Sequence, residues 1–196
     1  PCRDGHAVRH ADRHADRSGE GHLLRHPAVA CNLSVSCLAP GYRPGGAGER
    51  GNDNELQLVH GAKLFLKEEV RKNYPAIVVL PQCTINSFWS SLSFRADSLG
   101  KRSFVFNAAN EPTIAMKMAN GLLHELIKKY PVQKKKVYAG GLSMGGMGTF
   151  ELVYRNAGLF AAAIPICGGG DPAIAKKVRK TKWWVFHGAK DDVVLP

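Results

Sequence analysis

Several features that would point to a particular function class are missing from this sequence of 196 residues. No run of about 18 consecutive apolar residues occurs, so the sequence predicts no membrane-spanning helix. No apolar segment with a cleavage site opens the chain, so we identify no signal peptide and leave the cellular compartment open. The five cysteines never form a Cys-x-x-Cys pair, which excludes the common zinc-binding and thioredoxin-like patterns. We therefore expect neither a metal site nor a cofactor.

Lysine is also missing from the first part of the chain. Residues 1–62 contain seven arginines and no lysine, residues 63–196 contain five arginines and 15 lysines, and together these are the 27 basic residues of the sequence. Alanine, aspartate, arginine and histidine recur from His6 to Arg17, and such a segment cannot offset the entropy lost on ordering. We therefore expect residues 1–45 to be a disordered or non-native leader and residues 46–196 to fold as a domain.

The chain carries a formal net charge of +11, yet we expect no nucleic-acid partner. The lysine-rich runs at 134–136 and 176–180 stand next to predicted strands, where a solvated loop or helix face is the usual explanation. No recognised nucleic-acid-binding motif accompanies them.

Hydrophobic periodicity from residue 55 onward predicts helices that alternate with strands. The apolar run Ala76–Leu80 is typical of a buried strand in a parallel sheet. Apolar side chains recur every three or four positions over Ile114–Tyr130, which predicts an amphipathic helix that ends before Pro131. The other expected elements are a helix over Glu55–Asn73, an irregular loop over Ser87–Arg102, a strand from Lys136 to Ser143, a helix over Gly148–Asn156, a strand over Phe160–Ile166, a helix over Pro172–Lys180 and a strand over Lys182–His187. This alternation predicts an α/β fold with a mostly parallel sheet flanked by helices.

A glycine-flanked serine follows the strand that starts at Lys136. Residues Gly141 to Gly145 read Gly-x-Ser-x-Gly, with Ser143 at the centre. A serine on a strand-to-helix turn exposes its hydroxyl at the top of a sheet, and the first N–H groups of the following helix can stabilise an oxyanion. Ordinary glycine-rich turns match the same motif, but the flanking strand and helix favour a catalytic turn. We therefore expect Ser143 to be the nucleophile of an acyl-transfer reaction.

A second motif ends the last predicted strand, where the sequence reads His-Gly-x-x-Asp from His187 to Asp191. A carboxylate just past a strand end can orient an imidazole and stabilise its cation. A solvated turn after an edge strand would have the same sequence. We expect Asp191 to be the catalytic acid, and Asp192 is the alternative.

These two motifs resemble the α/β-hydrolase superfamily, and in particular its esterase branch, which includes carboxylesterases and feruloyl-esterase-like and polyhydroxybutyrate-depolymerase-like enzymes. A third segment, Gly46–Asn54, resembles the His-Gly-x-Gly-Glu-Arg-Gly segment of that branch. The resemblance implies that the N–H groups of Ala47 and Met144 form an oxyanion hole and that Asp191 is the acid of a triad. It covers about residues 46–196.

Two departures from the family pattern affect what we expect of this chain. Pro44 and its neighbouring glycines occupy the place of an apolar strand, and proline does not lie in a central strand. The family's catalytic histidine lies some tens of residues after the acid, whereas this sequence stops at Pro196. We therefore expect a C-terminally incomplete α/β-hydrolase fold, with weak or no esterase activity from the 196 residues alone. We expect His60 and His124 to be surface or packing residues rather than the base, and His187 lies too close to Asp191 in the sequence to be the family's base.

The sequence thus predicts a serine ester hydrolase of the carboxylesterase or lipase-like kind, acting through an acyl-enzyme on Ser143. Its substrate would be a small-molecule or polymeric ester, and neither the acyl group nor the oligomeric state can be inferred. Two alternatives stay open: a serine peptidase of the same fold, and a non-catalytic protein of this fold that binds a ligand.

Overall fold

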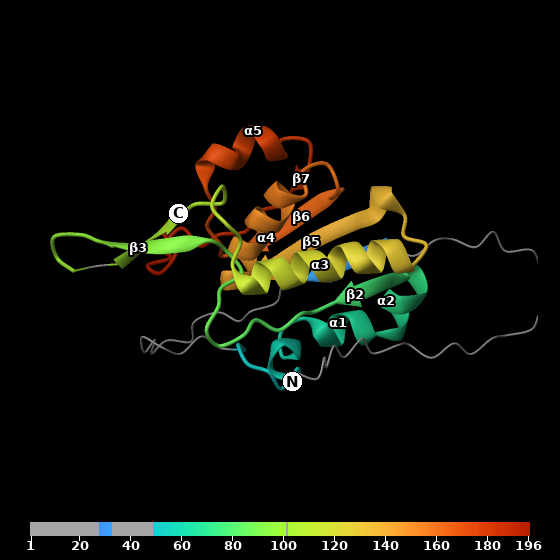
Figure 1. Cartoon of the computed structure of the whole chain (residues 1–196). Coiled ribbons are helices and arrows are strands. Elements are labelled where there is room, and N and C mark those ends of the chain that lie inside the picture. Colours follow the sequence, from blue (N-terminus) through green and yellow to red (C-terminus); the bar gives the residue numbers. More distant parts are fainter. Residues whose placement is uncertain (1–27, 33–48, 101) are drawn as a thin grey trace, which may run out of the picture.

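A five-stranded parallel sheet lies at the centre of the molecule (Figure 1). The computed structural model describes residues 28–32, 49–100 and 102–196. In their order across the sheet, the strands are β2 (Ala76–Val79), β1 (Ala28–Asn32), β5 (Val137–Leu142), β6 (Ala162–Ile166) and β7 (Lys182–Trp183). Beyond β7, an isolated bridge continues the pairing from Ile166 to Phe186. The predicted α/β fold with a mostly parallel sheet is confirmed.

The two longest helices of the described part share one core with the sheet. α3 (Ile114–Lys129) and α4 (Met144–Arg155) both contribute buried side chains to the cluster that contains Val137 and Ala163. The shorter helices are η1 (Leu56–Leu58), α1 (Ala62–Leu66), α2 (Glu68–Asn73), η2 (Lys134–Lys136), η3 (Pro172–Ile174) and α5 (Ala175–Val178). Helices α1 and α2 lie beside the edge strand β2 (Figure 1).

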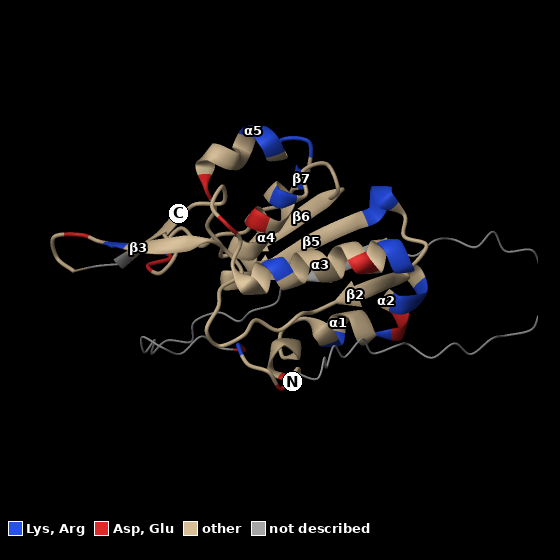
Figure 2. Ribbon diagram, in the orientation of Figure 1, with Lys and Arg blue, Asp and Glu red and all other residues tan. Residues whose placement is uncertain are grey.

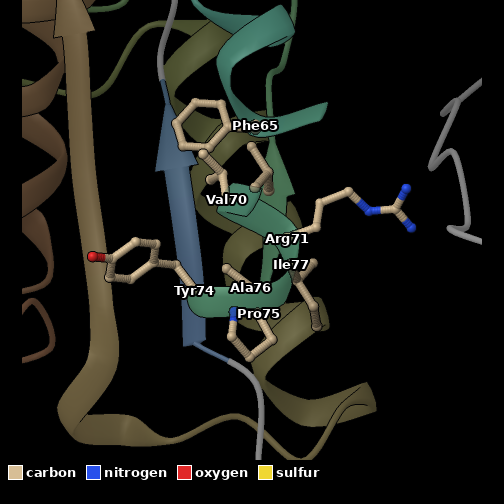
Figure 3. Close-up of a pocket in the computed structure, with 8 residues that line it drawn as sticks. Phe65, Val70, Arg71, Tyr74, Pro75, Ala76 and Ile77 are labelled. Carbon is tan, nitrogen blue, oxygen red and sulfur yellow. The ribbon is translucent and has the colours of Figure 1, made fainter. Parts of the chain in front are cut away.

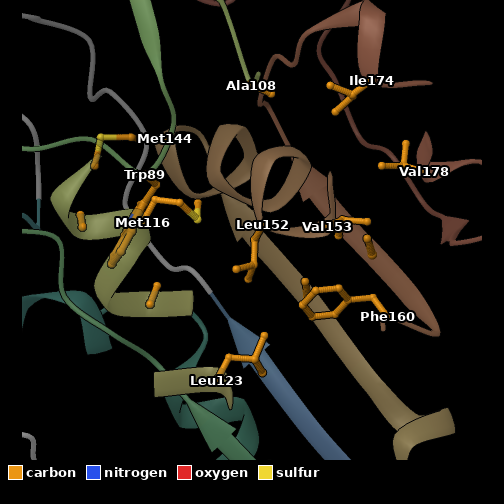
Figure 4. Close-up of a cluster of buried hydrophobic side chains, with 14 of the residues drawn as sticks. Trp89, Ala108, Met116, Leu123, Met144, Leu152, Val153, Phe160, Ile174 and Val178 are labelled. Atoms are coloured by element: carbon orange, nitrogen blue, oxygen red, sulfur yellow. The ribbon is translucent and has the colours of Figure 1, made fainter. Parts of the chain in front are cut away.

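Large side chains from several elements meet in this core (Figure 4). Trp89, Met116 and Leu152 are each no more than 1% exposed. Figure 4 shows Trp89 next to Met116, at the end of the cluster where Met144 lies. Burying a large apolar side chain contributes roughly 1.5–3 kcal/mol. The core therefore fixes the segment around Trp89 close to the start of α4.

Local sequence explains the bounds of α3. The Thr113 hydroxyl accepts a hydrogen bond from the Met116 N–H at 3.1 Å, which caps the helix. The helix ends at Tyr130, directly before Pro131, because proline disfavours a helical conformation of the preceding residue. The predicted helix Ile114–Tyr130 is confirmed.

Strand β1 lies within the predicted leader, so the prediction of disorder over residues 1–45 is wrong for Ala28–Asn32. Its Val29 pairs with Ile77 of β2 on one side and with Val137 of β5 on the other. Both partner strands are distant in the sequence, so the arginine-rich residues around β1 could not indicate this pairing. Strand β1 thus occupies an interior position of the sheet, between β2 and β5. The sequence indicates only that the residues around Pro44 cannot form such a strand. The remaining leader residues and Ala47 lie outside the described residues.

The predicted loop Ser87–Arg102 is also wrong, because most of it forms an antiparallel hairpin. Strand β3 (Leu92–Ala96) pairs with β4 (Arg102–Phe106) in a separate two-stranded sheet. Apolar and polar residues alternate in β3, and Gly100 between the two strands has a φ of 79° that favours glycine. This alternation was present in the sequence.

Smaller differences concern the ends and continuity of helices. The expected helix over Glu55–Asn73 is broken into η1, α1 and α2, since Gly61 has a φ of 82° and Lys67 a ψ of 133°. Helix α4 begins at Met144, four residues before the predicted start.

Lysine and arginine gather where the parallel strands begin (Figure 2). Lys128 and Lys129 end α3, and the exposed run Lys134–Lys136 leads directly into β5. This edge is opposite to the one where β5 ends in Ser143. Among the residues that the structure describes, no helix has both the length and the apolar character needed to span a bilayer.

The position of β1 can be tested with a proline substitution. Because β1 has a partner on each side, Val29→Pro removes a ladder N–H and should lower the free energy of unfolding by about 2 kcal/mol or more. Val29→Ile keeps that N–H and should cost less than half as much. Urea unfolding followed by circular dichroism measures both, and equal midpoints for wild type and Val29→Pro would contradict the central strand.

Candidate active site

Ser143 occupies a tight turn between β5 and α4. Its φ of 55° and ψ of −115° lie outside the regions that residues with a Cβ normally adopt. Two backbone hydrogen bonds hold it there: its N–H donates to the Ile166 carbonyl at 2.7 Å, and its carbonyl accepts from the Met147 N–H at 3.0 Å. The structure thus has the strand-to-helix turn that the glycine-flanked motif predicted.

Two glycines let the backbones around this turn approach closely. A Cβ on Gly146 would lie 2.9 Å from the Ile166 carbonyl oxygen, and one on Gly168 would lie 2.5 Å from the Gly146 carbonyl carbon. Real Cβ atoms do not come so close to backbone atoms. The first turn of α4 therefore rests directly on the segment that follows β6.

The start of α4 supplies N–H groups next to Ser143. The first N–H groups of an α-helix have no partner within the helix and carry a partial positive charge. Met144 is the first residue of this 12-residue helix, so its N–H belongs to that group. The other predicted oxyanion-hole residue, Ala47, lies outside the described residues.

The sheet register brings further segments to the edge that contains Ser143. Leu142 of β5 pairs with Ile166 of β6, and the Cys167 N–H donates to the Phe186 carbonyl at 2.8 Å. Because the strands are parallel, the segments after β5, β6 and β7 all leave from their carboxyl ends. Ligand sites of open α/β sheets form at this edge.

Asp191 stabilises the turn that follows β7. Its Oδ1 accepts the N–H groups of Val193 and Val194, both at 3.0 Å. Its Oδ2 lies 3.6 Å from Nε2 of His187, and this nitrogen is 2.8 Å from the Val194 carbonyl oxygen, to which it donates. The imidazole of His187 is therefore oriented by its own turn. The side chain of Asp192 is exposed.

The other two histidines of the described part contact side chains away from this turn. Nε2 of His60 is 3.3 Å from Oε1 of Glu49, and Nε2 of His124 is 2.8 Å from Oδ1 of Asn156. The structure thus brings Ser143 and Asp191 to one edge of the sheet, and it gives each described histidine a partner other than Ser143.

Gln82, three residues after the end of β2, is a residue to which the sequence analysis assigned no role. Its side-chain NH₂ donates to the Glu49 carbonyl at 3.1 Å and to Asp53 at 2.9 Å, and its Oε1 accepts from the Asn54 N–H at 2.7 Å. It therefore holds the segment that follows Ala47 against the end of β2. A polar side chain just past a predicted strand was the available signal.

Glu151 of α4 is a second residue that the sequence analysis missed. Its carboxylate is 1% exposed and accepts from Oγ of Ser90 at 2.8 Å and from the Ser91 N–H at 2.5 Å. It also pairs with Arg155 at 2.7 Å, and Arg155 donates to the Asn110 carbonyl at 2.7 Å. Glu151 thus ties α4 to the segments before and after the β3–β4 hairpin. Nothing in the sequence distinguishes it from a surface glutamate.

Cys83 is a buried free thiol. Burial raises the pKa of Cys83 to about 12, although the nearby Arg50 acts in the opposite direction. A thiol with this pKa stays protonated at neutral pH, and Cys83 donates to the Ser87 carbonyl at 3.4 Å. In the described part of the chain, no group of three or more His, Cys, Asp or Glu residues could hold a metal ion.

A surface pocket of about 240 Å³ lies where β2 begins (Figure 3). Its lining comes from α1 and α2 and from the beginning of β2, and it comprises Phe65, Val70, Arg71, Tyr74, Pro75, Ala76, Ile77 and Val78. Because parallel strands begin at one edge of a sheet and end at the other, this pocket and Ser143 belong to opposite edges.

Comparisons with known proteins relate this chain to esterases. It is similar to a solved crystal structure of a thermostable esterase, with 32% sequence identity and a TM-score of 0.70 over 90% of this chain and 42% of that chain. It is 33% identical over 73 residues to the bifunctional acetylxylan esterase/xylanase XynS20E of Neocallimastix patriciarum, a match that covers 37% of this chain and 11% of that protein. No family model matches.

These matches confirm the resemblance to esterases of the α/β-hydrolase fold that the sequence motifs indicated. The chain spans less than half the length of the solved esterase.

The close contact at Gly168 predicts a sensitive position. Gly168→Ala should lower the free energy of unfolding by about 1–3 kcal/mol, because the new Cβ meets backbone atoms of α4 that cannot rotate away. Gly121→Ala in α3 is the matched control, since its Cβ meets nothing within 4 Å, and it should raise stability by up to about 1 kcal/mol. Thermal and urea unfolding of both variants measure this, and an unchanged stability of Gly168→Ala would contradict the packing described.

Proposed function

We propose that this protein is a serine ester hydrolase that acts through an acyl-enzyme on Ser143. The observation that carries the proposal is the strained strand-to-helix turn at Ser143, in a chain 32% identical to an esterase over 90% of its length. Strain of this kind persists only where the surroundings hold it, and it is common at catalytic positions. A nucleophile elbow has this geometry.

In the proposed reaction, Oγ of Ser143 attacks the ester carbonyl and forms a tetrahedral intermediate. The N–H of Met144, at the start of α4, and that of Ala47 donate to the oxyanion. Collapse of the intermediate releases the alcohol, and water then hydrolyses the acyl-serine. One oxyanion-hole donor typically lowers the barrier by about 3–4 kcal/mol.

Asp191 serves in this proposal as the carboxylate that orients the general base. With Oδ1 engaged by two backbone N–H groups, the carboxylate is fixed in direction, and Oδ2 lies 3.6 Å from the imidazole of His187. The base itself is a histidine that we do not assign to His60, His124 or His187, each of which has another partner.

The substrate class that the similarities favour is a carboxylic ester. Both relatives described above are named as esterases. The match to the acetylxylan esterase/xylanase covers only 73 residues, so it supports an ester substrate in general and not a particular acyl group. We therefore propose an ester of a small molecule or a polymer as the substrate.

Ser143→Ala should abolish hydrolysis of p-nitrophenyl butyrate and labelling by a fluorophosphonate probe. The assay contains imidazole as an added base, because a serine without a base is a weak nucleophile at neutral pH. The rate in the same buffer without protein gives the background, which is subtracted because imidazole alone hydrolyses p-nitrophenyl esters. Ser93→Ala, which changes an exposed serine of the hairpin, is the matched control and should behave as wild type. Wild-type rates from Ser143→Ala would disprove the assignment.

In a protein that contains the histidine base, Asp191→Asn should reduce the Ser143-dependent rate by several orders of magnitude. Where added imidazole is the base, the reduction should be much smaller. The reason is that asparagine keeps the Oδ1 acceptor and hence the turn, but loses the charge that stabilises an imidazolium. Asp192→Asn changes the neighbouring exposed carboxylate and should have a mild effect. A larger loss of rate in Asp192→Asn than in Asp191→Asn would show that Asp192 is the acid.

A further inference from the structure

The β3–β4 hairpin displays phenyl rings in a continuous row on one of its faces. Phe94 faces Phe104 across the two strands, with ring centroids 5.2 Å apart. The centroid of Phe106 lies 6.1 Å from that of Phe104, and the centroid of Phe88 lies 6.5 Å from that of Phe94. We refer to these four residues as the aromatic row.

One end of the aromatic row contacts the loop next to Ser143. A Cβ on Gly169 would lie 2.5 Å from the ring of Phe106, so this ring packs directly on the backbone after β6. The preceding residue, Gly168, packs in the same way on Gly146 in the first turn of α4. Two adjacent glycines therefore separate the ring of Phe106 from the helix turn that Ser143 begins.

The other end of the row reaches the segment that follows Ala47. The guanidinium of Arg50 lies 4.9 Å above the ring of Phe88, and its Nη1 donates to the Ser87 carbonyl at 3.0 Å. Figure 1 shows the hairpin projecting from the edge of the sheet where β5 and β6 end. The row thus extends from the loop next to Ser143, at Phe106, to Arg50, which lies beside Phe88.

The hairpin is firmly attached at its base, while the row stays accessible to solvent. The Ser91 carbonyl accepts the Asn107 N–H at 3.0 Å, and Ser91 is also bound by the buried Glu151. Phe94 is nevertheless 50% exposed, and Phe88, Phe104 and Phe106 are half-buried. Exposed phenyl rings on a fixed support offer apolar area to a ligand at little cost in conformational entropy.

We propose that the aromatic row binds an apolar alkyl or aryl group of the ester substrate, carried by its acyl or its alcohol part. This inference rests on the proposed function of Ser143. Phenyl rings offer apolar contact area and no hydrogen-bond donors or acceptors, so they favour an extended apolar group over a charged or hydroxyl-rich one. The row therefore sets a preference for esters larger than acetate.

The test compares short and long esters with aromatic-row variants of the full chain. We measure kcat/KM for p-nitrophenyl acetate and octanoate, with imidazole present, in wild type, Phe94→Ala and Phe104→Ala. The octanoate value should fall about tenfold or more, and the acetate value should stay within about twofold, because only the long chain reaches the row. Ethyl and octyl acetate repeat the comparison for the alcohol part.

The matched control is Val105→Ala, on the opposite face of the same hairpin, where the valine is 38% exposed. It should leave both series within about twofold of wild type. A loss in only one series identifies which part of the ester the row binds. Unchanged values in both series, an equal loss for short and long esters, or the same loss in Val105→Ala would overturn the inference.

A binding measurement separates failure of this inference from failure of the proposed function. Isothermal titrations of octanoate and of 1-octanol into the full chain need no turnover. The Kd of the ligand that represents the ester part bound by the row should rise about tenfold in Phe94→Ala. Ser143-dependent hydrolysis with both Kd values unchanged in Phe94→Ala would overturn the aromatic row alone. A Kd that depends on Phe94, in a chain without Ser143-dependent hydrolysis, would overturn the proposed function alone.

Discussion

The candidate active site depends on one backbone hydrogen bond, from the Ser143 N–H to the Ile166 carbonyl at 2.7 Å. Ser143 has a positive φ, so the turn alone does not favour its conformation. The bond continues the ladder between β5 and β6 one residue past the paired strands and holds the serine at the edge of the sheet. It can form only because Gly146 and Gly168 let the two backbones meet. The conformation of the serine is therefore a consequence of how the sheet and α4 pack.

The same helix fixes the surroundings of the serine through a buried charge. Removing a carboxylate from water costs several kcal/mol unless charges and hydrogen-bond donors replace the solvent. Glu151 meets that condition with Arg155 and with the donors of Ser90 and Ser91. Helix α4 is thus anchored at its first turn by glycine contacts and farther along by this ion pair. As a result, Ser143 and the base of the β3–β4 hairpin are held by one rigid element.

Short-range patterns were enough to predict the turn at Ser143, the strand at Ala76 and the helix α3, because each is determined by a few adjacent residues. Strand β1 could not be predicted in this way, since its hydrogen-bond partners lie in β2 and β5, far along the chain. The role of Glu151 was hidden for a similar reason: its burial depends on Ser90 and Ser91, about 60 residues away. The hairpin is different, because the alternation of apolar and polar residues in β3 was present in the sequence.

The hairpin and the turn at Ser143 belong to separate sheets, so the residues that hold the serine are separate from those of the aromatic row. The turn at Ser143 is built from backbone contacts at the end of the main sheet, and a side chain added at Gly168 would disturb it. The hairpin forms its own two-stranded sheet, and its exposed Phe94 takes no part in the pairing of the five-stranded sheet. Side chains of the hairpin can therefore change without altering the ladder that holds the serine. On the function proposed above, the fold holds the reacting group in place, and the inferred preference among substrates comes from a ribbon attached at the edge of the site.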